Sequence, residues 1–252
     1  MTNGSTLLDL GALQLPNAAR KQLANTTRQM RIFDHFMTVR PDLWATALTT
    51  RSLPGGPVVA DNSDEGQRRS ADGQPAISRA QLFRLGAQAN GDDSGVGALR
   101  LLWHTLAWGT GTGARNNIRR LDAVASDPIG AAKVLHEAGQ LAATDPQAAF
   151  AHLRPGRKNV VSSLGPAFFT KYLYFAGAGE ADHPSLILDA RVATALNQHC
   201  AWSTLHQKGP WPSVTYERYC TLLARWAVEM STHDRPLAAD ELERWLFEEK
   251  RP

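Results

Sequence analysis

Apolar residues recur at helical spacing along most of this chain, and this pattern limits its fold more than any other feature of the sequence. The clearest stretch is 95–108, where Val96, Leu99, Leu102 and Leu106 lie three or four positions apart. No alternation of apolar and polar residues continues long enough to predict a strand. The pattern therefore predicts an all-α fold, with one helix starting after Ser78 and further helical segments at 17–51 (in two parts, the second from Pro41), 95–108, 116–125, 128–142, 146–153, 190–200, 216–230 and 240–249.

Local signals divide the chain and mark several helix starts. Residues 52–77 are rich in Pro, Gly, Asp and Ser, which is typical of an irregular, mobile connection. We therefore expect an N-terminal helical segment at 1–51, a connection at 52–77 and a helical core at 78–252. Ser78 with Gln81 has the form of a capping box, and Asp127 and Asp145 are candidate N-caps because a proline follows each of them.

Composition limits the classes of protein to consider. No apolar run of the 252-residue chain approaches the roughly 18 residues of a membrane span, and residues 1–15 lack the pattern of a secretory signal. We therefore expect a cytoplasmic location and no membrane partner. Two cysteines and eight scattered histidines predict no metal site and no cofactor. The net charge of +3 permits a polyanionic partner without requiring one, and we expect a monomer.

The stretch 160–175 contains the first candidate for chemistry. Gly165 and Pro166 punctuate the chain, and proline suits the first turn of the helix that follows. At about 100° per residue, Lys171 falls within roughly 60° of Phe168 and Phe175 on that helix. In one interpretation its stem covers the aromatic surface and its ammonium stays in water. In the other, the amine lies in a cleft that lowers its pKa and exposes a nucleophilic lone pair.

Asp189 is the second candidate, because it ends the apolar run 186–188. In one interpretation, this aspartate is the N-cap of the next helix and has no other role. The same position would also keep its carboxylate ionised, as a group that stabilises positive charge requires.

A lysine on a helix that follows a glycine hairpin, with an aspartate at a helix start 18 residues later, resembles the helix-hairpin-helix DNA glycosylases. The closest likeness is to 8-oxoguanine DNA glycosylases, and it covers about 160–196, with a looser similarity at Trp108 and Gly109. The resemblance implies two helical lobes with a DNA-binding cleft between them. It also implies a helix-hairpin-helix at about 159–177 and a catalytic aspartate segment at 186–196. The sequence departs from the family pattern at Pro166, which has no amide proton to offer a phosphate.

The resemblance also implies roles for individual residues. Lys171 would attack C1′ of the sugar, and Asp189 would support the cationic transition state. The partner would be double-stranded DNA with a flipped, modified nucleotide. Candidate DNA contacts are Leu164, Gly165, Arg157, Lys158 and Arg115, and the aromatic candidates for the base pocket are Phe175, Phe168, Trp202 and Trp211.

Four functions stay open on the sequence alone. The first is removal of 8-oxoguanine, with or without cleavage of the strand as an abasic-site lyase. The second is removal of a bulky hypermodified base, such as glucosylated hydroxymethylcytosine, from phage DNA in antiphage defence. The third is a non-catalytic helix-hairpin-helix module that only binds DNA. The fourth is an all-α interaction protein with no affinity for DNA.

Overall fold

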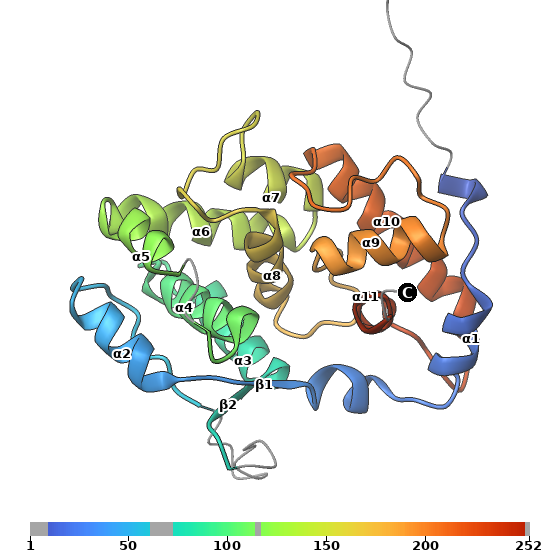
Figure 1. The fold of residues 1–252 in the computed structure, drawn as a ribbon, viewed down its shortest axis with the longest axis horizontal. Helices are drawn as coiled ribbons and strands as arrows, with labels where there is room; N and C mark the ends of the chain where they lie inside the picture. The colour runs from blue at the N-terminus through green and yellow to red at the C-terminus, as the bar shows by residue number, and fades with distance from the viewer. Residues whose placement is uncertain (1–9, 61–72, 114–116, 250–252) are drawn as a thin grey trace, which may run out of the picture.

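A computed structural model describes residues 10–60, 73–113 and 117–249 of the chain. These residues form mostly helices, as the apolar spacing predicts (Figure 1). The α-helices are α1 Asn17–Leu23, α2 Pro41–Thr49, α3 Arg79–Asn90, α4 Val96–Thr110, α5 Asn117–Ala125, α6 Pro128–Ala142, α7 Pro146–Leu153, α8 Pro166–Ala176, α9 Ala190–His199, α10 Ser213–Met230 and α11 Ala239–Glu248. A 3-10 helix spans Leu10–Ala12 and a π-helix, η2, spans Gln29–Phe33. Within the described ranges, no helix is both long and apolar enough to cross a membrane.

A small sheet is the main departure from the predicted helices. Strand β1, Phe36–Thr38, pairs antiparallel with β2, Ala76–Ser78, so that Phe36 lies opposite Ser78. The prediction of helix throughout 17–51 is therefore wrong at β1. Three residues are too few to show the two-residue period of a strand, and the pairing partner lies about 40 positions away.

The connection at 52–77 is irregular in its described parts, but residues 52–60 are packed rather than loose. Leu53 and Val58 are buried, and Trp103 Nε1 donates a 2.8 Å hydrogen bond to the carbonyl of Pro54. The predicted mobility of 61–72 lies outside the described residues. The apolar side chains of Leu53 and Val58 therefore belong to the core around α4.

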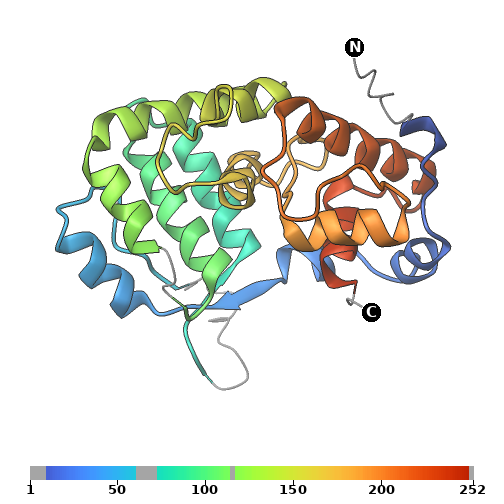
Figure 2. The ribbon, with the colours of Figure 1, turned by 45° about the horizontal axis from the view of Figure 1, so that its top comes forward.

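The helices form two groups on either side of α8. Figures 1 and 2 show α2 to α6 on one side and α1, α9, α10 and α11 on the other. In the first group α3 and α4 pack on each other and on α8, and in the second α9 and α10 pack on α11. The groups are joined where α7 packs on both α6 and α10. Helix α8, which packs on α3, α4, α6 and α7, thus lies at the boundary between the two lobes (Figure 1).

The predicted helix starts are confirmed by hydrogen bonds. Asp127 Oδ1 accepts from the amide of Gly130 at 2.9 Å, and Asp145 Oδ1 accepts from Ala148 at 2.8 Å. Ser78 Oγ accepts from the amide of Gln81 at 3.0 Å. Each bond satisfies an amide that the first turn of a helix leaves without an intrahelical partner.

A buried network of charged and polar side chains ties α3 and α8 to α11. Arg79 and Glu243 form an ion pair of 3.1 Å, and both side chains are 1% exposed. Tyr174 of α8 donates to Asp240 at 2.9 Å, and Arg28 pairs with the same carboxylate at 2.8 Å. Because these groups come from both lobes, the network fixes how α11 sits against α8.

Close packing of α3 on α8 leads to a first testable prediction. A Cβ at Gly86 would lie 2.0 Å from the carbonyl oxygen of Phe175, and neither backbone can move without shifting a helix. We expect Gly86→Ala to lower the free energy of unfolding by about 1–3 kcal/mol or more, measured by urea denaturation. Gly91→Ala is the matched control, since a Cβ there would come no closer than 3.9 Å to its nearest neighbour. Equal stability of the two variants would contradict this account of the α3–α8 contact.

Candidate active site

Helix α8 holds Lys171 in the interior. Gly165 is the N-cap of this helix and Pro166 is its first residue, as the sequence predicts. The Lys171 side chain is only 8% exposed, so its ammonium is not simply extended into water. Gly109, at the end of α4, leaves room for the stem, because a Cβ there would lie 3.4 Å from Lys171 Cδ and 3.1 Å from Phe168.

Asp189 meets this lysine from the start of α9. Its Oδ1 accepts from the amides of Arg191 at 3.0 Å and Val192 at 3.2 Å, and its Oδ2 accepts from Lys171 Nζ at 3.0 Å. One carboxylate therefore caps a helix and pairs with the lysine.

The chain on either side keeps these two residues in register. Thr170 Oγ1 accepts from the amide of Leu188 at 3.2 Å, and its one proton is shared between the carbonyls of Pro166 at 2.8 Å and Leu188 at 3.1 Å. Since Thr170 precedes Lys171 and Leu188 precedes Asp189, these bonds hold the two backbones together directly beside the ion pair.

The surroundings of Asp189 keep its carboxylate ionised. Burial by itself raises the pKa of this carboxyl, but the charge and hydrogen bond of Lys171 and the amides of Val192 and Arg191 act in the opposite direction. The opposing contributions are larger in sum, and they hold the pKa of Asp189 below its ordinary value. Lys171 Nζ donates a further hydrogen bond, of 2.9 Å, to the carbonyl of Ala167.

A hollow of about 390 Å³ lies beside residues that flank the pair, and neither Lys171 nor Asp189 is itself among the residues that line it. It reaches Ala167, whose carbonyl binds Lys171, and Ala190, which follows Asp189. Three cationic side chains line it from separate parts of the chain, and they are Arg120, Arg154 and Lys208. The lining is completed by Asn159, Ser163, Gly165, Pro166, Phe168, Gly209, Pro210 and Trp211.

Arg120 is held rigidly at this hollow. Its guanidinium carbon lies 3.8 Å from the centroid of the Phe168 ring. Its Nε donates to the carbonyl of Ser163 at 3.1 Å, and its Nη1 donates to Asn117 at 2.7 Å. A cation fixed in this way loses little conformational entropy when it contacts an anion.

Only some of the residues predicted to contact DNA or the base line this hollow. Gly165, Phe168 and Trp211 line the hollow, whereas Phe175 and Trp202 are buried elsewhere. Phe175 packs against Trp108 with the ring centroids 5.2 Å apart, at the end of α8 away from the hollow.

The predicted DNA contacts are likewise divided. Leu164 is 2% exposed and its amide already donates to the carbonyl of Val161, so this amide is not free for a phosphate. Arg157 and Lys158 are exposed in the loop after α7. Arg115 lies outside the described residues.

Sequence patterns missed Lys208 and Asn159, which lie in irregular segments with no periodicity to single them out. The nearest signal was the cluster of Gly209, Pro210 and Pro212 between two helices. As for metals, no group of three or more His, Cys, Asp or Glu side chains suited to binding one occurs in the described ranges.

Comparison with known proteins places the chain in a family. The family model described as "Putative 8-oxoguanine DNA glycosylase OGG-like protein" matches residues 30–247. No curated protein and no solved structure matches the sequence. The match covers α2 to α10 and most of α11, including the helix that carries Lys171 and the segment that ends in Asp189. This chain therefore belongs to the OGG-like family of putative 8-oxoguanine DNA glycosylases.

Proposed function

We propose that this protein is a DNA glycosylase that removes an oxidised base of the 8-oxoguanine type from double-stranded DNA. The observation that carries the proposal is the 3.0 Å contact between Lys171 Nζ and Asp189 Oδ2 beside the hollow. A glycosylase has to reach C1′ of the sugar, so the target nucleotide must first leave the base stack.

Asp189 is the group that stabilises charge in this mechanism. As the base departs with the electrons of the glycosidic bond, positive charge develops at C1′ and on the ring oxygen of the sugar. A carboxylate that is already ionised and fixed by two backbone amides can stabilise that charge without reorganising. The lowered pKa of Asp189 keeps the group in the required form at neutral pH.

Lys171 is the proposed nucleophile. Its ammonium must give up a proton to water before the nitrogen lone pair can attack C1′, and Asp189 Oδ2, 3.0 Å away, orients the amine while the carboxylate stays ionised. Attack forms the bond from Nζ to C1′ as the bond from C1′ to the base breaks. Opening of the sugar ring then gives a Schiff base, from which β-elimination cleaves the strand.

The hollow is the proposed site for the DNA backbone. Arg120, Arg154 and Lys208 supply positive charge from three parts of the chain. The amide of Ala167 lies in the first turn of α8, where helix amides lack intrahelical partners and favour anions. A phosphate held here would lie next to the residues that flank Lys171 and Asp189.

The direct test measures free base released by the wild-type protein. The substrate is a duplex with one 8-oxoguanine opposite cytosine, and a duplex with guanine at the same position is the control. We expect 8-oxoguanine in solution, detected by mass spectrometry, and no guanine. Parallel reactions of the protein with phage DNA that contains glucosylated hydroxymethylcytosine test the alternative substrate.

Other outcomes would overturn the proposal in distinct ways. Release of the hypermodified cytosine alone would move the substrate to phage DNA and the role to defence. Salt-sensitive DNA binding without release of any base would indicate a non-catalytic DNA-binding module. Absence of salt-sensitive DNA binding would indicate a protein that acts through other partners.

A further inference from the structure

His35, which lies between η2 and β1, is held in one orientation by Arg79 of the buried network and by Trp108. Its Nδ1 accepts a 3.3 Å hydrogen bond from Arg79 Nε. Its ring meets the Trp108 ring edge-on, with centroids 5.3 Å apart and planes at 88°. Arg79 cannot turn away, because its Nη1 donates to Tyr174 and to Glu243 at 3.1 Å each.

These contacts determine which nitrogen of His35 carries the proton. A guanidinium can only donate, so Nδ1 must present its lone pair, and the proton of the neutral imidazole is then on Nε2. Burial, followed by the positive charges of Arg79 and Arg244, lowers the pKa of His35 to about 2, and the ring is neutral. Among the described residues no acceptor for Nε2–H is found. His35 therefore offers a fixed donor that the fold itself does not use.

On one side, contacts lead from His35 to Lys171. Trp108 lies between His35 and Phe175, which is one helical turn beyond Lys171 on α8. The next residue, Gly109, packs on the stem of Lys171 itself.

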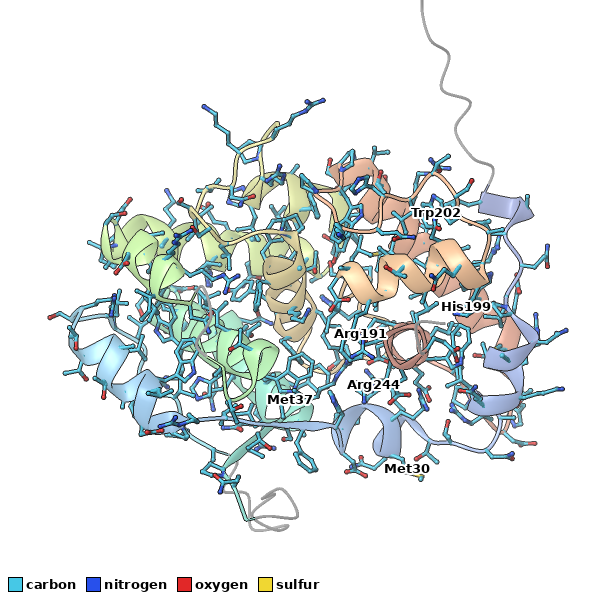
Figure 3. All side chains as sticks on the ribbon, viewed as in Figure 1. Met30, Met37, Arg191, His199, Trp202 and Arg244 are labelled. Atoms are coloured by element: carbon cyan, nitrogen blue, oxygen red, sulfur yellow. The ribbon has the colours of Figure 1, made fainter. Side chains whose placement is uncertain are left out.

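On the other side, an electrostatic interaction and two ring contacts relate His35 to the start of α9, where Asp189 lies. Arg244 acts electrostatically on His35, and its guanidinium lies 5.4 Å from the centroid of the Phe247 ring. Arg191, two residues after Asp189, lies 4.1 Å over the same ring. In Figure 3 Arg191 extends from α9 toward α11, where Arg244 is also labelled. Ring contacts through Trp108 thus link the unused donor to the residues that pack on Lys171, and the charge of Arg244 with the Phe247 ring links it to Arg191 near Asp189.

We infer that His35 reads the extruded base by donating a hydrogen bond from Nε2 to an acceptor on its edge. This inference rests on the proposed function and adds a residue that positions its substrate. Every DNA base carries a carbonyl oxygen or an unprotonated ring nitrogen, so His35 would favour the orientation of the base that turns such an acceptor toward Nε2. An orientation that turns the acceptor away would leave the donor unsatisfied on closure, which disfavours it.

Two variants separate the reading role from the structural role of His35. His35→Asn keeps a side-chain oxygen near the position of Nδ1 to accept from Arg79, but it has no donor at the position of Nε2. His35→Gln places an amide N–H near the position of Nε2. Each variant is tested for single-turnover release of 8-oxoguanine opposite cytosine. Each is also tested for borohydride trapping on a duplex with a preformed abasic site, which has no base to read.

We expect His35→Asn to release 8-oxoguanine about 10-fold more slowly or worse, and His35→Gln to recover most of that rate. Trapping on the abasic duplex should be the same for both variants and the wild type. Wild-type release by His35→Asn would overturn the inference alone. Equal loss of both activities in both variants, with lower melting temperatures, would overturn it in favour of a structural role. A wild-type protein inactive on both duplexes would overturn the proposed function, and the inference with it.

Discussion

Asp189→Asn is expected to slow release of 8-oxoguanine by about 10²- to 10³-fold, the usual loss when one preorganised electrostatic group is removed from a transition state. The substitution keeps the shape of the side chain and its ability to cap α9, because asparagine caps a helix about as well as aspartate. What it removes is the negative charge next to Lys171 and C1′. Single-turnover release from the 8-oxoguanine duplex measures the effect.

The same experiment distinguishes loss of charge from loss of structure. Removing an anion cannot weaken attraction to a polyanion, so DNA affinity should be unchanged or higher while the rate falls. Asp145→Asn is the matched control, because Asp145 caps α7 through the same kind of bond and has no part in the site. Release by Asp189→Asn within a few-fold of the wild-type rate would contradict the role of the carboxylate.

Lys171→Gln is expected to abolish the covalent adduct that borohydride traps between protein and damaged DNA. The adduct requires the amine, since the reductant converts its Schiff base with the sugar to a stable secondary amine. Asp189 and water can still release the base slowly, so the variant should leave intact abasic sites. Gel electrophoresis of the trapped adduct and of the cleaved strand measures both steps.

Lys171→Gln also leaves the buried Asp189 without its ion-pair partner, which lowers the stability of the folded protein. A loss of activity in this variant therefore needs a control for stability. Lys171→Arg is that control, because arginine can still pair with Asp189 but stays protonated and cannot attack C1′. Lys133→Gln, at a side chain 76% exposed on α6, is the control for the substitution itself. An adduct formed by Lys171→Arg at the wild-type level would exclude Lys171 as the nucleophile.

Much of the fold follows from local sequence. The helical spacing of apolar residues predicts the helices from α4 to α11, and α6 and α7 begin at the predicted prolines after their aspartate caps. The resemblance to 8-oxoguanine DNA glycosylases, carried by Lys171 and Asp189, is confirmed at the level of the family. These features depend on residues close together in the chain, so they can be predicted without a structure.

Tertiary structure decided what those residues can do together. The sequence left two interpretations of Lys171 open, and burial beside Gly109 with Asp189 at 3.0 Å excludes the one in which the ammonium stays in water. Strand β1, the place of Lys208 at the hollow and the bond from Arg79 to His35 had no local signal. Arg79 lies 44 positions from His35, and Arg120 lies 43 positions from the Ser163 carbonyl that holds it. Spacing along a chain specifies the faces of a helix, but contacts at such separations arise only when the faces of different helices are packed together.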